Sequence, residues 1–249
     1  MTIGAAYIPS PLSSSSSAAE RQVLFDRIAP VYDSLNDTLT FRQHRVWKRM
    51  SVSWSRAKKG DRVLDLCCGS GDLTFLLSER VGSQGETNGV DFSSEQLSIA
   101  SSRQRSRWRR CYSNIAWSVG DAVDLRFPDE HFDAITVGYG LRNIVDKPKA
   151  MEEIFRVLKP GSTVSVLDFN KASNATAFVA TFQDWMIDNV VVPAATRYGL
   201  KEEYAYLKAS IAEFLTGKEQ EKLAKEVGFS GVKHYEIAGG LMGNLVAVK

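Results

Sequence analysis

Residues 63–72 read Val-Leu-Asp-Leu-Cys-Cys-Gly-Ser-Gly-Asp and combine an apolar run with two glycines and two carboxylates. Gly69 and Gly71 allow a tight turn without a Cβ clash, so the pattern is typical of a buried strand that turns directly into a helix. Asp91 follows about twenty residues later, at the end of another apolar run. In a doubly wound sheet, a carboxylate at this position binds both hydroxyls of a ribose. The spacing therefore predicts a nucleotide pocket.

The charges around the glycine turn indicate which kind of nucleotide would bind. A pyrophosphate prefers a helix N-terminus without anions, but Asp72 lies in the first turn of the expected helix and Asp65 ends the preceding strand. Two carboxylates repel a dinucleotide and attract a nucleotide-like ligand that carries positive charge. S-adenosylmethionine has a sulfonium and an ammonium group, so we expect it as the cofactor. The alternative for Asp72 alone is that it only caps the helix.

The overall composition excludes several classes of protein. The chain has 249 residues, 44% apolar and 24% charged, which is typical of one domain with a large core. Its net charge of +2 provides no strong field for nucleic acid. The three cysteines, two of them adjacent at Cys67 and Cys68, have neither metal-ligand nor disulfide-framework spacing, so we expect no metal. No apolar run approaches the roughly 20 residues of a membrane span.

Residues 1–19 differ from the rest of the chain. They are rich in serine and alanine and contain no acidic residue. This composition suits an organelle transit peptide, but the first arginine is Arg21, which leaves a plain disordered tail as the alternative. We expect a disordered leader or transit-peptide remnant over residues 1–19 and a single domain over residues 20–249.

Helical and β patterns alternate after residue 20. We expect helices over residues 20–28, 41–58, 73–80, 95–109 and 149–158, and strands over residues 62–66, 87–90, 115–119, 132–137, 163–167, 232–237 and 245–248. Strands separated by helices form a parallel sheet covered on both faces, with the last two strands as an edge hairpin. This predicts an α/β fold with a doubly wound, mostly parallel seven-stranded sheet. An N-terminal helical lid over residues 20–58 and a helical insert over residues 175–227 complete it.

Ligands of such a sheet bind at the carboxyl ends of its strands. At the third strand end, Asp121 and Ala122 offer a carboxylate and a backbone amide that can read an adenine edge; a plain loop is the alternative. This layout resembles the class I S-adenosylmethionine methyltransferases, which are Rossmann-like. The segment RVLKPGSTVSV, residues 156–166, strengthens the resemblance. One departure is Cys67, because that class usually has glycine there and a side chain narrows the turn.

Two segments carry a more specific resemblance. Residues 32–47, YDSLNDTLTFRQHRVW, and residues 138–146, GYGLRNIVD, closely resemble signatures of the membrane-quinone C-methyltransferases, the family that methylates ubiquinone and menaquinone precursors. The similarity extends to residues 203–214 and 238–249. Within the family, residues 138–140 and 168–170 are most similar to the plant and cyanobacterial branch that methylates demethylphylloquinone.

The resemblance implies a methyl transfer from S-adenosylmethionine to the ring of a reduced prenylated naphthoquinone. It also implies that Thr74 and Tyr139 contact the cofactor, although a backbone cap and simple packing are their alternatives. Residues 175–227 would then bind the acceptor. A benzoquinol of the ubiquinone pathway is the alternative acceptor. We expect a chloroplast location, with the mitochondrion as the alternative, and peripheral contact with a membrane.

The chemistry of such a transfer needs an electron-rich ring carbon. A reduced quinol that ionises to a naphtholate provides one, and a nearby cation lowers the cost of ionisation. By resemblance, Arg142 holds the developing oxyanion, Asn143 orients the same oxygen and Tyr32 relays a proton or positions the ring. The alternatives are that Arg142 pairs with Asp146, that Asn143 forms a turn and that Tyr32 packs in the lid.

Several other residues have a structural interpretation that outweighs a functional one. His44 fits the first signature, but a lone histidine on an apolar helix is more often structural. Asp168, Tyr198 and Tyr206 could line the acceptor pocket, and strand-end or helix packing is the commoner role. Residues 178–192 carry apolar side chains at helical spacing that suit an isoprenoid tail or an ordinary core.

A cluster of arginines is the main charge feature, comprising Arg103, Arg105, Arg107, Arg109 and Arg110 around Trp108. Such a run is most often a solvated helix face. An anionic membrane surface would bind the same charges. A nucleic-acid-binding module with a vestigial cofactor pocket is the rival from another class. Because the acidic and glycine positions of the pocket are intact, we expect no nucleic-acid partner.

Overall fold

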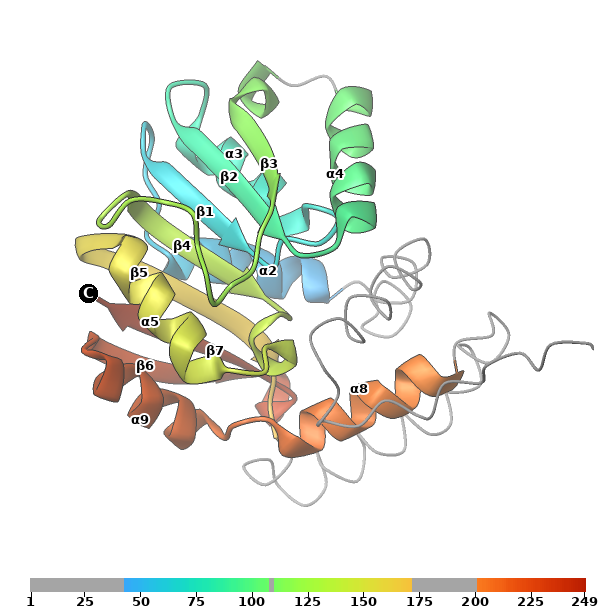
Figure 1. Ribbon diagram of the computed structural model, residues 1–249, viewed down its shortest axis with the longest axis vertical. Helices are drawn as coiled ribbons and strands as arrows, with labels where there is room; N and C mark the ends of the chain where they lie inside the picture. Colours follow the sequence, from blue (N-terminus) through green and yellow to red (C-terminus); the bar gives the residue numbers. More distant parts are fainter. Residues whose placement is uncertain (1–42, 108–109, 172–200) are drawn as a thin grey trace, which may run out of the picture.

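A seven-stranded sheet forms the centre of the structure, a computed structural model that describes residues 43–107, 110–171 and 201–249 (Figure 1). The strand order is β3-β2-β1-β4-β5-β7-β6. The strands are β1 (Arg62–Leu66), β2 (Glu86–Asp91), β3 (Ile115–Val119), β4 (Phe132–Gly138), β5 (Leu158–Phe169), β6 (Ser230–Ile237) and β7 (Met242–Val248). Strands β1 to β5 pair in parallel, and β7 is antiparallel to both β5 and β6. The expected doubly wound α/β fold with a hairpin at one edge is confirmed.

Helices cover both faces of this sheet. Those with described residues are α2 (His44–Trp54), α3 (Asp72–Val81), α4 (Ser94–Ser106), α5 (Lys147–Val157), α8 (Lys201–Glu213) and α9 (Gly217–Val227). Val63 of β1 packs with α2 and α3, whereas its neighbour Leu64 packs with α5 and α9. Successive strand residues point to opposite faces, so these two helix pairs lie on opposite sides of the sheet (Figure 1).

The main boundary that differs from expectation is between α5 and β5. Leu158 was expected to end a helix, but it has extended backbone and begins β5, whose first residues include Pro160 and Gly161. At the other end of α5, the Asp146 carboxylate caps the helix by accepting a hydrogen bond from the Lys149 backbone N–H at 2.9 Å. A short helix thus leads directly into the longest strand of the sheet.

Parts of the expected organisation lie outside the described residues. These parts are the leader over residues 1–19, the helix over residues 20–28, Tyr32, Tyr198 and all of residues 178–192. The described portion of the expected insert forms α8 and α9. Within the described segments, no helix combines the length and the apolar character required for a membrane span.

Candidate active site

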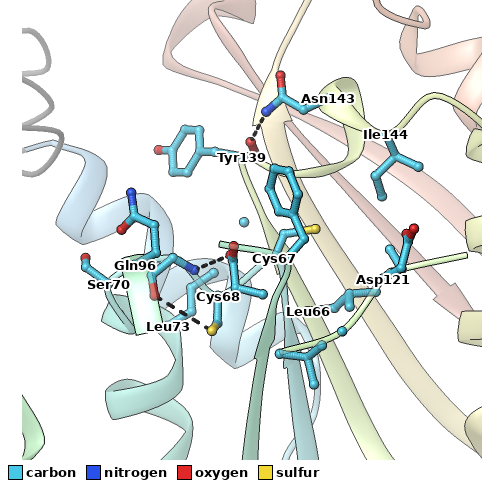
Figure 2. Close-up of a pocket in the computed structure, with 18 of the residues that line it drawn as sticks. Leu66, Cys67, Cys68, Ser70, Leu73, Gln96, Asp121, Tyr139, Asn143 and Ile144 are labelled. Carbon is cyan, nitrogen blue, oxygen red and sulfur yellow. Dashed lines mark hydrogen bonds between the residues drawn. The ribbon is translucent and has the colours of Figure 1, made fainter. Parts of the chain in front are cut away.

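A pocket opens at the carboxyl ends of the parallel strands (Figure 2). Its walls come from the ends of β1, β2 and β4, from α2 and from the loops after β3 and β4. Of the residues expected at the site, those lining the pocket are Gly69, Asp91, Asp121, Ala122, Tyr139 and Asn143. The strand-end rule therefore brought residues from four separate chain segments to one cavity.

The glycine turn after β1 has the backbone that its sequence predicts. Gly69 and Gly71 have φ angles of 53° and 90°. A Cβ on Gly71 would lie 2.6 Å from the Trp117 ring, so no larger residue fits there. Cys67 adopts a φ of 56°, which is uncommon for a residue with a side chain. A Cβ on Gly140 would overlap the Cys67 side chain, so Gly140 provides the space that Cys67 occupies.

Asp91 links the glycine turn to the end of β2. Its carboxylate accepts hydrogen bonds from the backbone N–H of Gly69 at 2.7 Å and of Ser93 at 3.0 Å. The side chain lines the pocket. Two backbone donors hold the carboxylate in the position expected for a ribose ligand.

Asp65 and Thr74 lie beneath the pocket and do not line it. The hydroxyls of Thr74 and Thr136 donate hydrogen bonds to the Asp65 carboxyl at 2.6 and 2.8 Å. Burial raises the pKa of Asp65 to about 7, against the lowering effect of these hydrogen bonds. The geometry favours a role for both residues in bracing β1, α3 and β4 below the turn.

Asp72, at the start of α3, is neutralised by two cations. Lys48 Nζ lies 2.7 Å from Asp72 Oδ2, and Arg103 Nη2 lies 2.5 Å from Asp72 Oδ1. Burial alone would raise the pKa of Asp72, but the charges of Lys48 and Arg103 hold it well below its usual range. Because Asp72 is paired and Asp65 is buried, these two carboxylates do not supply the negative charge that was expected to attract a cationic cofactor. The acidic side chains of the pocket that lie away from this cluster are Asp91, Asp121 and Asp146.

The loop after β4 places Asn143 in the pocket and Arg142 behind it. Arg142 is buried and its Nη1 donates to Asp168 Oδ1 at 2.6 Å and to the Tyr139 carbonyl at 2.8 Å. Asn143 Nδ2 donates to the same carbonyl at 3.1 Å (Figure 2). Tyr206 of α8 donates its hydroxyl to Asn143 Oδ1 at 3.2 Å. Arg142 therefore pairs with Asp168 and not with Asp146, and it fixes the loop whose next residue faces the cavity.

The pocket's donor set fits S-adenosylmethionine. Asp91 has a fixed carboxylate of the kind that binds a ribose, and Asp121 and Ala122 line the same pocket as the apolar Phe92 and Val123, a combination that suits an adenine. The loop after β4 packs closely on the glycine turn, because Gly140 lies against the Cys67 side chain. These features match a compact nucleoside with a charged side chain.

Comparison with known proteins decides the family. The family model described as the ubiE/COQ5 methyltransferase family matches residues 14–249. The chain belongs to this methyltransferase family. It is 64% identical over 231 residues to the "2-phytyl-1,4-beta-naphthoquinone methyltransferase, chloroplastic" of Arabidopsis thaliana, covering 92% of this chain and 87% of that protein. It is 50% identical over 228 residues to the "2-phytyl-1,4-naphtoquinone methyltransferase" of Nostoc sp., covering 92% and 98%.

Solved structures agree with the assignment of fold. A methyltransferase from Thermotoga maritima aligns with a TM-score of 0.64 at 16% identity, covering 91% of this chain and 99% of that one. One from Aquifex aeolicus aligns with a TM-score of 0.55 at 19% identity, covering 77% and 83%. The expected class I fold, the enzyme class and the cofactor S-adenosylmethionine are confirmed.

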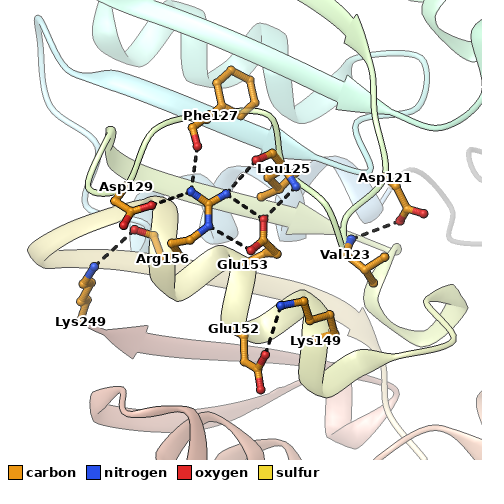
Figure 3. Close-up of polar contacts among 10 residues, drawn as sticks. All are labelled: Asp121, Val123, Leu125, Phe127, Asp129, Lys149, Glu152, Glu153, Arg156 and Lys249. Atoms are coloured by element: carbon orange, nitrogen blue, oxygen red, sulfur yellow. Dashed lines mark hydrogen bonds and ion pairs between the residues drawn. The ribbon is translucent and has the colours of Figure 1, made fainter.

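A polar network holds the loop after β3 of this methyltransferase, residues 121–131, against α5 (Figure 3). Arg156 donates to the carbonyls of Leu125 and Phe127 at 2.7 and 2.8 Å and to the Asp129 carboxylate at 2.7 Å. Glu153 accepts from Arg156 and from the Leu125 backbone N–H at 2.8 Å. The sequence pattern predicts only that Arg156 lies near the end of a helix. Its partners in the loop are about thirty residues away, so no local pattern indicates them.

Some of the expected site residues do not line the cavity of the methyltransferase, and one residue that does line it was not expected. Asp65, Gly71, Thr74 and Arg142 support the lining without being part of it. Tyr32 lies outside the described residues. Lys48, which lines the pocket, was overlooked although it lies one helical turn after His44, directly after the first signature segment.

Proposed function

We propose that this methyltransferase methylates the ring of a reduced prenylated naphthoquinone, 2-phytyl-1,4-naphthoquinol, in the last methylation of phylloquinone biosynthesis. The observation that carries the proposal is 64% identity over 92% of the chain to the Arabidopsis enzyme of that name. Relatives from cyanobacteria at about 50% identity have the same designation. The ubiquinone-pathway benzoquinol is a weaker candidate because these names all specify a phytyl naphthoquinone. The family assignment likewise disfavours a nucleic-acid-binding module.

The acceptor reacts as the quinol and not as the quinone. S-adenosylmethionine supplies an electrophilic methyl group from its sulfonium. An oxidised quinone ring is electron-poor, whereas a naphtholate places negative charge on the adjacent ring carbon. The side chain that faces this oxygen must therefore stabilise an oxyanion.

Asn143 has the position for this task. Its amide nitrogen lies in the pocket wall and donates one hydrogen bond to the Tyr139 carbonyl, while its oxygen accepts from Tyr206. Both ends of the amide are held, so its orientation is fixed before the acceptor binds. Arg142 is already paired with Asp168. This pairing supports a positioning role for Arg142, with the direct oxyanion contact made by Asn143.

The N-terminal segment and the insert complete the acceptor side in this proposal. Tyr32 relays the proton that leaves the quinol or positions its ring. Residues 175–227 receive the prenyl tail, and the contact between Tyr206 and Asn143 supports a direct connection from this insert to the reacting end. Asp65 and Thr74 act on the cofactor through the turn above them.

A plastid location and a membrane-bound acceptor fit the same proposal. The Arabidopsis relative is named chloroplastic, and residues 1–19 have the composition of a transit-peptide remnant. Ile144 and the 61% exposed Val145 give the pocket an apolar edge. Such an edge suits peripheral contact with the bilayer that holds a prenylated acceptor.

The proposal is tested by supplying the purified protein with labelled S-adenosylmethionine and a choice of acceptors. We expect label in chemically reduced 2-phytyl-1,4-naphthoquinone, little label in its oxidised form and little in a prenylated benzoquinol. Equal rates on both redox states would contradict the naphtholate mechanism. Faster turnover of the benzoquinol would contradict the acceptor assignment, and no turnover of any prenylated quinol would contradict the function.

A further inference from the structure

The pocket has an uneven distribution of charge. Among the described residues that line it, Lys48 is the only lysine or arginine, and the acidic ones are Asp72, Asp91, Asp121 and Asp146. The Lys48 side chain is only 8% exposed. A buried ammonium is costly to desolvate unless it is paired, so its location in a ligand pocket needs a physical reason.

The partner of Lys48 within the protein does not by itself account for it. Asp72 also binds Arg103, whose guanidinium is anchored by the Ser70 carbonyl and hydroxyl at 2.8 and 2.7 Å. The cluster of Lys48, Asp72 and Arg103 thus contains two positive charges and one negative charge. Arg103 already offers one cation to Asp72, and Lys48 adds a second at the N-terminus of α3, where the helix dipole is also positive.

The ammonium of Lys48 lies in the wall of the cavity. An ammonium has three N–H donors, and Asp72 Oδ2 accepts one of them at 2.7 Å. The nitrogen also lies 5.7 Å from the centroid of the Tyr139 ring, across the pocket wall. Lys48 therefore lies between the start of α3, directly after the glycine turn, and the loop after β4, on the wall of the same pocket.

We propose that Lys48 binds the carboxylate of the methionine moiety of S-adenosylmethionine. This carboxylate is the single anionic group of the donor, and Lys48 is the cation that the described pocket wall offers to it. The acidic side chains elsewhere in the wall remain for the ribose and the ammonium. The contact also makes α2, which belongs to the N-terminal segment, part of the cofactor site.

The proposal is tested with two ligands that differ only in the carboxylate. S-adenosylmethionine and decarboxylated S-adenosylmethionine are titrated calorimetrically into the full-length protein, without acceptor, so that affinity and not turnover is measured. We expect the natural protein to bind the carboxylated ligand about 10- to 100-fold more tightly, the range of a charge-assisted hydrogen bond. In Lys48→Met this preference should fall to less than about threefold, mainly through weaker binding of the carboxylated ligand.

Control variants separate ligand binding from a structural role. Arg49→Met removes a positive charge from an exposed neighbour on α2 and should leave the preference unchanged. In Lys48→Met/Asp72→Asn the carboxylate that loses its partner is also removed, and the loss of preference should persist. Equal weakening of both ligands by Lys48→Met, recovery in the double variant, or no preference in the natural protein would overturn the proposal. If the natural protein bound neither ligand, the cofactor assignment itself would fail.

Discussion

Asn143 lies where the loop after β4 meets α8. It follows Arg142 in the loop after β4, donates to the Tyr139 carbonyl and accepts from Tyr206 of α8. The buried pair of Arg142 and Asp168 fixes this loop from below. A side chain held from several directions gives a small amide dipole a fixed orientation, which is the condition for stabilising charge that develops during a reaction.

Replacing Asn143 should therefore lower turnover more than binding. We predict that Asn143→Ala reduces kcat for the reduced naphthoquinone about 100- to 1000-fold, the usual loss when one oxyanion donor is removed. The affinity for S-adenosylmethionine should change less than about threefold. Single-turnover methylation and calorimetry measure the two effects separately.

Tyr206→Phe is the matched control, because it removes the hydroxyl that orients Asn143 and leaves the amide in place. A loss of less than about tenfold is expected for this variant. A large loss of cofactor affinity in Asn143→Ala, with little change in kcat, would contradict an oxyanion role and indicate a cofactor contact.

Cys67 shows how far single residues could be interpreted from the sequence. Its unusual position in the glycine turn was recognisable because neighbouring residues set the expected pattern. The reason why a side chain is tolerated there could not be predicted. Gly140 makes room for the Cys67 side chain, and it follows another strand more than seventy residues away. Lys48 was missed for a similar reason, because its partner Asp72 comes from a separate helix.

Among the elements, the strands were the most predictable. β1 and β3 have the boundaries expected from their apolar runs, and the terminal hairpin of β6 and β7 follows from its glycine-rich turn. The start of β5 was wrong by five residues. A buried leucine such as Leu158 is common both at the end of a helix and at the start of a strand, so its type does not distinguish the two. Local periodicity identifies an element, whereas its ends depend on tertiary contacts.

The loop after β3 depends on such contacts for its function. Hydrogen bonds from Arg156 and the Leu125 N–H hold the pKa of Glu153 below its usual range, so this network is ionised at neutral pH. α5 thereby anchors the segment that brings Asp121 and Ala122 to the pocket (Figure 3). We therefore expect these contacts to act on cofactor binding and not on the acceptor.

Arg156→Met should therefore change KM for S-adenosylmethionine and leave kcat almost unchanged. We predict that KM for S-adenosylmethionine rises about tenfold, as expected when charged hydrogen bonds to the loop are lost. The kcat should change less than about twofold, because the acceptor side is intact. Arg126→Met, on the exposed side of the same loop, is the control and should leave both constants near their original values. A fall in kcat at constant KM would contradict the positioning role.

The stability of the whole protein depends on carboxyl groups whose pKa values are shifted by folding, some downward and one upward. Lys48 and Arg103 hold the pKa of Asp72 below its usual range, and hydrogen bonds from Asn88 and Arg62 do the same for Glu86. Their contributions to stability are present above about pH 4 and are lost as the pH falls below it. Burial raises the pKa of Asp65 to about 7 and gives it the opposite dependence.

Asp65 should accordingly weaken the fold as the pH rises. The folded protein retains a proton that the unfolded chain releases near pH 4, so the stabilising contribution is complete below that pH and is lost as the pH rises through about 7. We predict that this group alone lowers the free energy of unfolding by about 2 to 3 kcal/mol between about pH 5 and pH 8. Asp65→Asn cannot release the proton and should lack this decline.

Urea unfolding of both proteins across this pH range measures the difference. His131 and His234, whose pKa values burial lowers, stabilise the fold above pH 6.5 and act in the opposite direction. They are present in both proteins, so their effect cancels when the two curves are subtracted. Parallel curves would mean that Asp65 is ionised throughout, and that the hydroxyls of Thr74 and Thr136 fully offset its burial beneath the cofactor turn.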